Sequence, residues 1–268
     1  MIKSTKFIGK QWHHFEVTDS TNTEARRLLQ NLSGKSSSKN IHGTLLTTFN
    51  QIQGVGQRGN TWQSEADKNI AYSLILQNVP LQPSEFFLLN MATALSVHAT
   101  LSEFIALHKP VANPLLKIKW PNDIFFDAQK LSGMLIQNLA QGNTIAQTVI
   151  GIGINVNQTN FENLPDAISL RSVTNINHDL WQLVERLSIN LENFYELLLT
   201  SPPKIIAQYH AHLYKMNEHA IYKRRIDNQF FEGTILNVTA EGKLEMQTRR
   251  GVEVFIMQEI AFINANNA

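Results

Sequence analysis

The chain has no cysteine among its 268 residues. Disulfide bonds, zinc sites built on thiolates and a cysteine nucleophile are therefore excluded. A protein without cysteine suits the reducing cytoplasm, and we expect a cytoplasmic protein. The sequence also has no run of about 20 apolar residues that could cross a membrane, and its first residues lack the apolar segment of a secretory signal. We therefore expect no membrane association.

A strong charge of either sign is also missing. The 23 lysines and arginines nearly balance the 22 aspartates and glutamates, which leaves a net charge of +1. Such a chain has no field that favours nucleic acid or a membrane surface, so we expect no specific binding to DNA. The length suits one large domain, or one domain plus a small one, and with 43% hydrophobic residues a full-sized core is possible.

Four segments carry apolar residues at the three- and four-residue spacing of an amphipathic helix. We expect helices over residues 19–32, 83–107, 179–200 and 204–214. Short apolar segments predict strands over residues 43–49, 70–77, 115–120, 123–126, 130–138 and 145–157. From Ala220 onward, alternating apolar residues are separated by Asp-Asn, Glu-Gly and Arg-Gly turns, which is typical of a small β-barrel.

Gly54, Gly56 and Gly59 have the G-x-G-x-x-G spacing of a dinucleotide-binding turn. That turn must open a helix and be followed about 20 residues later by an acidic side chain. Here a second strand follows, and the residue 20 positions after Gly59 is Val79. We interpret the segment as a loop between two strands. It is either a plain glycine hairpin or a loop whose backbone N–H groups bind an anion, with Arg58 at its tip.

The segment VIGIGINVN, residues 149–157, also has an unusual distribution of glycine. In a strand, Gly151, Gly153, Asn155 and Asn157 share one face, and the apolar residues share the other. Glycine within a strand often marks the close approach of a ligand or of another backbone. The pattern alone leaves both interpretations open.

Lysine, asparagine and aspartate gather in the segment KIKWPNDIFFDAQKLSG. Lys119 lies on a short strand that Pro121 ends, so Asn122 and Asp123 stand at its tip, and Lys130 begins the next strand. Asn and Asp at a strand end ordinarily form a turn, and a lysine at a strand start is ordinarily solvated. Taken one by one, these residues do not define a function.

Four motifs occur in the order found in biotin–protein ligases. They are DSTNTEA, Q-x-x-G-x-G-x-R-G-x-x-W, KWPNDI followed by KLSGMLIQ, and IGIGINVN. The chain resembles this family over nearly its whole length. The resemblance implies an α+β fold with a central mixed sheet and flanking helices, related to class II aminoacyl-tRNA synthetases and lipoate ligases. It also implies a catalytic domain over residues 1–215 and an SH3-like barrel over residues 216–268. Because the ligase pattern begins at Asp19, the short form without an N-terminal DNA-binding domain is expected.

The chemistry that this resemblance implies has two steps. Biotin reacts with ATP and Mg²⁺ to give biotinyl-5'-AMP, and a lysine of a biotin carboxyl carrier protein then accepts the biotinyl group. Two alternatives remain open, namely a lipoate or octanoate ligase of the same superfamily and a biotin-binding protein without catalysis. The sequence leaves open whether the protein is a homodimer.

The resemblance also implies site residues. Biotin would contact Ser20, Thr21, Asn22, Gln51, Gly54, Val55, Gly56, Gln57, Trp62, Lys130 and Gly133. ATP would contact Arg58, Asn122, Asp123, Lys130, Gly151, Gly153 and Asn155, and the catalytic cations would be Lys130, Arg58 and Lys119. No residue is assigned as a metal ligand. The family loop usually reads near G-R-G-R-x-G, whereas Val55 and Gln57 stand at the two arginine positions here. We therefore expect weaker retention of the adenylate.

Overall fold

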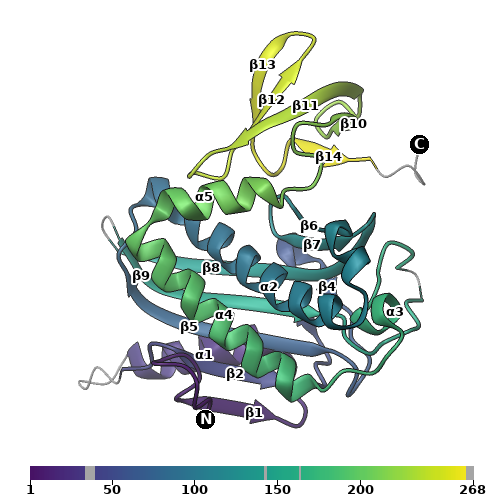
Figure 1. The fold of residues 1–268 in the computed structure, drawn as a ribbon. Helices are drawn as coiled ribbons and strands as arrows, with labels where there is room; N and C mark the ends of the chain where they lie inside the picture. The colour runs from purple at the N-terminus through teal and green to yellow at the C-terminus, as the bar shows by residue number, and fades with distance from the viewer. Residues whose placement is uncertain (34–39, 142–143, 163, 264–268) are drawn as a thin grey trace.

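The computed structural model describes residues 1–33, 40–141, 144–162 and 164–263. Its centre is a seven-stranded sheet with the order β1-β2-β5-β9-β8-β7-β6. The strands are β1 (Trp12–Phe15), β2 (Thr44–Thr48), β5 (Ile70–Val79), β9 (Thr144–Ile154), β8 (Gln129–Gln141), β7 (Asp123–Phe126) and β6 (Leu116–Lys119). β1 and β2 are parallel, and the other neighbouring pairs are antiparallel. The expected mixed sheet is therefore confirmed (Figure 1).

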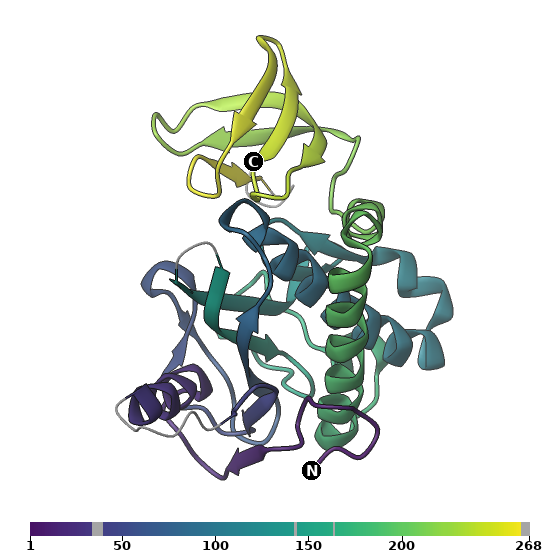
Figure 2. The same ribbon diagram turned by 90° about the vertical axis from the view of Figure 1, so that its left-hand side faces the viewer.

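Helices cover both faces of this sheet (Figures 1 and 2). Helix α1 (Thr21–Ser33) packs through Ala25 and Leu29 against Ile75 and Val149 on one face. The other face carries α2 (Phe86–His108), α4 (Leu180–Thr200) and α5 (Pro202–Ala211). α2 is apolar on most of its circumference because it is enclosed by the sheet, α4 and α5. Successive side chains of β5 and β9 point to opposite faces of the sheet, so the two strands supply one apolar layer to each face.

The C-terminal part of the chain forms a second sheet with the order β13-β12-β11-β10-β14. Its strands are β10 (His219–Arg224), β11 (Phe230–Val238), β12 (Leu244–Thr248), β13 (Gly251–Phe255) and β14 (Ile260–Phe262), all antiparallel. This small sheet is consistent with an SH3-like fold. In the described residues its hydrogen-bonded order runs from β13 to β14 without closing into a barrel.

Specific contacts dock this second sheet on the first part of the chain. The Trp120 indole nitrogen donates a hydrogen bond of 3.1 Å to the Gly242 carbonyl. The His210 ring on α5 lies within hydrogen-bonding distance of the Val238 backbone through its Nε2 atom. Met216 and Ile235 form an isolated parallel β-bridge. The C-terminal sheet therefore sits at the end of the central sheet where β6 and β7 lie (Figure 1).

Several element boundaries differ from those expected. The strand predicted to reach residue 157 ends at Ile154, and the Asn155 amide that follows donates to the carbonyls of Lys130 on β8 and Ile168 in a loop. The last helix begins at Pro202, where proline suits a first turn, and ends at Ala211. β1 and the short helix α3 (Leu170–Thr174) lacked a sequence pattern. No helix of the described ranges is long and apolar enough to cross a membrane.

Candidate active site

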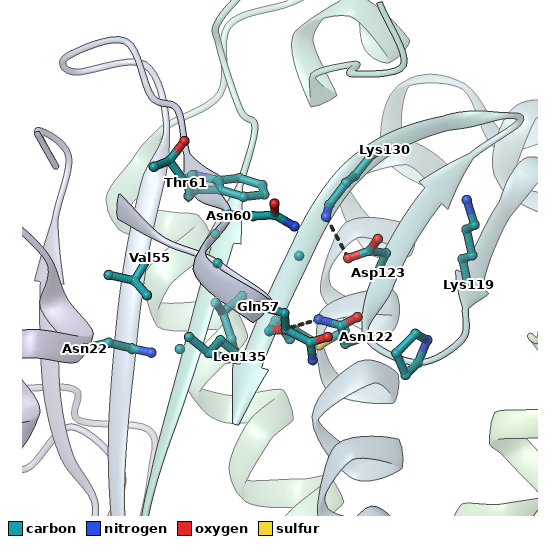
Figure 3. A pocket seen from close by; sticks show the side chains of 18 of the residues that line it. Asn22, Val55, Gln57, Asn60, Thr61, Lys119, Asn122, Asp123, Lys130 and Leu135 are labelled. Atoms are coloured by element: carbon teal, nitrogen blue, oxygen red, sulfur yellow. Dashed lines mark hydrogen bonds and ion pairs between the residues drawn. The ribbon is translucent and has the colours of Figure 1, made fainter. Parts of the chain in front are cut away.

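One cavity of about 330 Å³ opens beside α1, on the face of the sheet that this helix covers. Its wall comes from the start of α1, the hairpin of β3 (Gly54–Val55) and β4 (Thr61–Trp62), and the strands β5 to β9. Residues of the C-terminal sheet complete it. Figure 3 shows Asn22 and Val55 on one side and Asp123, Lys130 and Lys119 on the other.

Neutral polar groups form the end of the cavity next to α1. Ser20, Thr21 and Asn22 are all buried there, where the helix begins. The Gln51 side-chain oxygen accepts a 2.9 Å hydrogen bond from the Thr21 backbone N–H, a group that has no partner within the helix. Gln51 thereby caps α1 and holds the three-residue run against the cavity.

Two glycines of β9 let side chains lie flat on the sheet. A Cβ atom at Gly151 would stand 2.3 Å from the Asn22 side chain, and one at Gly153 would stand 2.5 Å from the Trp62 indole. Both distances are shorter than any real contact of a Cβ atom, so a larger residue would displace Asn22 or Trp62. Asn22 and Trp62 thus cover the glycine face of β9 within the cavity. Among the residues that the structure describes, the buried Trp62 Nε1 atom has no hydrogen-bond partner.

Lys130 lies at the opposite end from the neutral groups. Its Nζ atom stands 2.8 Å from Asp123 Oδ1 and 5.7 Å from the centre of the Trp62 ring (Figure 3). Its backbone is fixed as well, since the Lys130 N–H donates to Asp166 and its carbonyl accepts from Ile168. Asp123 therefore orients a cation whose position along the strand is already set.

Lys119 is a second cation with a different environment. Its ammonium lies over the Phe125 ring, 4.1 Å from the ring centre, and 5.4 Å from that of Phe262. Burial lowers the pKa of Lys119 from 10.5 to about 8, although the nearby Asp123 carboxylate favours the charged form. An anionic ligand beside Lys119 would replace the missing solvation.

Asn122 directly precedes β7 and is hydrogen-bonded to Met134 of β8. Its backbone carbonyl accepts from the Met134 N–H at 2.9 Å, and its amide nitrogen donates to the Met134 carbonyl. The amide oxygen of Asn122 is thus the group left for a ligand. Within the described residues, no group of three histidine, aspartate or glutamate side chains could hold a metal ion.

Most of the residues predicted for the site meet at this cavity. The lining includes Ser20, Thr21, Asn22, Gln51, Val55, Gly56, Gln57, Trp62, Lys119, Asn122, Asp123, Lys130, Gly133, Gly151 and Gly153. Gly54 lies behind the lining, against Gln51 and the Trp62 backbone. Asn155 is buried, and its amide donates to the carbonyls of Lys130 and Ile168. The side chain of Arg58 is outside the described part of the chain.

Sequence reasoning missed the contribution of the C-terminal sheet. Arg225, Met257, Ile260, Ala261 and Phe262 line the cavity beside Lys119. Their sequence carries no motif, because their position depends on how the second sheet docks. Asn60 and Thr61 of the hairpin and Met134 and Leu135 of β8 were also missed. They stand next to predicted residues, so proximity in sequence was the available signal.

Comparison with known proteins identifies the family. A sequence profile of the Biotin/lipoate A/B protein ligase family matches residues 14–155. The chain belongs to this family. The bifunctional ligase/repressor BirA of Bacillus spizizenii is 28% identical over 96% of this chain and 75% of its own length. A biotin–[acetyl-CoA-carboxylase] ligase of Mycobacterium tuberculosis is 30% identical over 76% of this chain and 72% of its own.

Solved structures agree with this assignment of the ligase family. The biotin protein ligase of Aquifex aeolicus, solved in complex with biotin and ATP, superposes with a TM-score of 0.71. The match covers 96% of this chain and 100% of that one, at 22% identity. This protein therefore has the same overall fold as the Aquifex aeolicus enzyme.

Proposed function

We propose that the protein is a biotin–protein ligase. In the first step, a biotin carboxylate oxygen attacks the α-phosphorus of ATP, forming biotinyl-5'-AMP and releasing pyrophosphate. In the second, a lysine amine of a biotin carboxyl carrier domain attacks the anhydride carbonyl. An amide forms, the amine loses a proton, and AMP leaves. The observation that carries this proposal is a single cavity with neutral polar groups at one end and two lysines at the other.

The neutral end suits the ring system of biotin. Ser20, Thr21, Asn22 and Gln51 offer hydroxyl and amide groups, and a ureido group has both N–H donors and a carbonyl acceptor. A linear acyl chain with a dithiolane has no partner for these buried groups, and leaving them unpaired would cost binding free energy. This end therefore favours biotin over lipoate, although the family includes ligases for both.

The lysine end suits the reacting groups. Lys130 would contact the biotin carboxylate and then the adenylate phosphate, where negative charge accumulates in the transition state. Lys119 and Asn122 would hold the phosphates of ATP. Gly151 and Gly153, which were expected beneath the nucleotide, are covered by Asn22 and Trp62, so they would act on the ligands through these two side chains. Asn155 would act through the backbone of Lys130, which it supports.

The hairpin over the cavity would protect the intermediate. The Gly56 N–H donates to the Asn60 carbonyl and Gly54 lies behind the lining, so the hairpin would contact the carboxylate and phosphate through Val55 and Gln57. Trp62 would wall the pocket against water. Arg58 would add a cation from the tip. Residues 1–215 would form the catalytic domain and residues 216–268 the SH3-like domain, in a cytoplasmic enzyme.

Magnesium would enter with ATP. This ion is commonly bound by substrate phosphates, waters and one or two carboxylates, so a dedicated protein cage is unnecessary. Asp123, the carboxylate of the cavity lining, and the Asn122 amide oxygen fit that role. The ion would neutralise charge on the departing phosphates.

Isotope exchange between pyrophosphate and ATP tests the proposal. Exchange should depend on biotin and should be absent with lipoate, with octanoate and without an acid. Transfer is then followed as AMP release and a mass increase of a purified biotin carboxyl carrier domain, with its acceptor lysine changed to arginine as the control. Exchange with lipoate would favour the alternative ligase, and biotin binding without exchange would indicate a protein that only binds biotin.

A further inference from the structure

Ser73 is a fully buried hydroxyl behind the neutral end of the cavity. It stands in the middle of β5, opposite Leu46 of β2 on one side and Gly151 of β9 on the other. It is not part of the cavity lining, and none of the four family motifs includes it. A hydroxyl buried at this position requires hydrogen-bond partners.

The partners of Ser73 are two residues that do line the cavity. Its Oγ atom lies 2.8 Å from Thr21 Oγ1 and 2.5 Å from Asn22 Oδ1. A serine hydroxyl has one proton and can donate to only one of them. The Asn22 oxygen has no proton, so Ser73 donates to Asn22. The Thr21 hydroxyl then has two acceptors for its proton, the Ser73 Oγ atom at 2.8 Å and the Gln51 Oε1 atom at 3.5 Å.

This chain of hydrogen bonds determines what each residue presents to a ligand. With its oxygen held by Ser73, Asn22 directs its amide nitrogen into the cavity, as Figure 3 shows. With its proton used by Ser73 or Gln51, Thr21 presents a lone pair to the ligand. Packing against Gly151 keeps the Asn22 side chain in this place, and the hydrogen bond from Ser73 determines which way its amide faces.

We propose that Ser73 is a positioning residue that fixes the polarity of the biotin site. It makes Asn22 a donor and Thr21 an acceptor, so the ligand ring must present an acceptor to the first and an N–H to the second. A cyclic urea has both groups. A cyclic guanidine, in which a protonated nitrogen replaces the urea oxygen, has only donors and is rejected. This inference rests on the proposed function.

The test compares biotin with its cyclic guanidine analogue, 2-iminobiotin, in pyrophosphate exchange. We expect Ser73→Ala to raise the KM for biotin by roughly tenfold, while kcat and the KM for ATP stay within about twofold. The preference for biotin over the analogue, as a ratio of kcat/KM, should fall by roughly tenfold, because Asn22 is released to turn its oxygen outward. A loss of packing alone would weaken both ligands equally.

Ser96→Ala is the matched control. Ser96 is equally buried, on α2, and its hydroxyl donates to the Ala92 carbonyl at 2.7 Å. This variant should keep the preference of the natural enzyme. A preference that stays unchanged in folded Ser73→Ala overturns the proposal.

A second variant tests the same polarity with Ser73 intact. Asn22→Asp keeps the shape of the side chain but presents an oxygen where the amide nitrogen was. It should favour the guanidine analogue over biotin, and a retained preference for biotin would contradict the proposal. If the natural protein shows no exchange that depends on biotin, the ligase function itself fails, which is a separate outcome.

Discussion

At the scale of single residues, the two lysines of the site are held in different ways. Lys130 is paired with Asp123 at 2.8 Å, so its charge is compensated before a ligand binds. Lys119 has aromatic rings as its nearest partners, and burial lowers its pKa to about 8. Lys119 is therefore the group whose protonation depends on whether an anion is bound.

Binding of ATP should be coupled to protonation of Lys119. Phosphate oxygens favour the ammonium form and raise the pKa of Lys119 back toward 10.5, so the complex takes up a proton between about pH 8 and pH 10. Calorimetry at pH 8.5 in buffers of different ionisation enthalpy measures this uptake. Lys119→Met should abolish it. Identical binding enthalpies in all buffers for the natural protein would contradict the prediction.

The same shift makes a prediction about stability. Between pH 8 and 10.5 the unfolded chain binds more protons at Lys119 than the folded chain does, so this residue makes stability rise with pH in that window. Below pH 8 both states are charged, and the folded state bears the full cost of burying the ammonium. Lys119→Met should therefore raise the free energy of unfolding at pH 7, by on the order of 1 kcal/mol. Chemical denaturation at pH 7 and pH 10 tests this sign, since the gain should shrink at the higher pH.

Removal of the Lys130 ammonium group should slow the chemical step. Lys130→Ala should lower the rate of pyrophosphate exchange by roughly ten- to a hundredfold, because one charge-assisted contact in the transition state is lost. Lys204 is an exposed lysine on α5, and Lys204→Ala is the control, which should leave the exchange rate unchanged. Exchange at the natural rate in Lys130→Ala would remove this residue from the mechanism.

At the scale of elements, the hairpin of β3 and β4 carries the departure from the usual family loop. Val55 pairs with Thr61, lines the cavity and is 40% exposed. Val55→Arg should add a cation over the phosphate and slow the release of preformed biotinyl-AMP by roughly threefold to thirtyfold. Ile52→Arg places the same charge on a more exposed neighbour outside the lining and should have no effect. Equal release rates in both variants and the natural protein would mean that charge on this hairpin does not retain the intermediate.

The elements also show how far sequence patterns lead. The spacing of apolar residues in α2 and α4 and the short apolar run of β5 were sufficient to predict those elements, because buried regular elements leave such patterns. The end of β9 was missed because Asn155 continues the alternation of the sequence, although its amide donates to the carbonyls of Lys130 and Ile168 beyond the end of the strand. β1 was missed because a four-residue edge strand with two histidines carries no such pattern.

At the scale of the whole molecule, the candidate site is shared between the two sheets. Motifs within the first 155 residues were sufficient to predict most residues of the cavity walls formed by α1, the hairpin and β8. Within each of these motifs the residues are close in sequence, so a short pattern can identify them. The wall formed by Arg225 and Phe262 could not be predicted. It depends on contacts such as Trp120 with Gly242, which link residues 122 positions apart.

Arg225 should make the C-terminal sheet necessary for nucleotide binding. Its backbone N–H donates to the Glu259 carbonyl at 2.7 Å and its Nε to the Ile260 carbonyl at 3.2 Å, so the guanidinium of this lining residue is held beside β14, the strand whose Phe262 ring lies near Lys119. A guanidinium stays charged at every working pH and can bind two phosphate oxygens at once. Arg225→Ala should therefore raise the KM for ATP and for pyrophosphate by roughly fivefold to fiftyfold, with little effect on the KM for biotin. Arg225→Lys should recover part of the loss.

Arg250→Ala separates this local effect from damage to the sheet. Arg250 is exposed in the turn between β12 and β13, away from the cavity lining, so its loss removes the same charge from the same sheet. Both variants should melt at the temperature of the natural protein, and only Arg225→Ala should change the kinetics. If the two variants bind ATP equally well, the C-terminal sheet closes the cavity through Met257 and Phe262 alone, and its arginine has no part in holding phosphate.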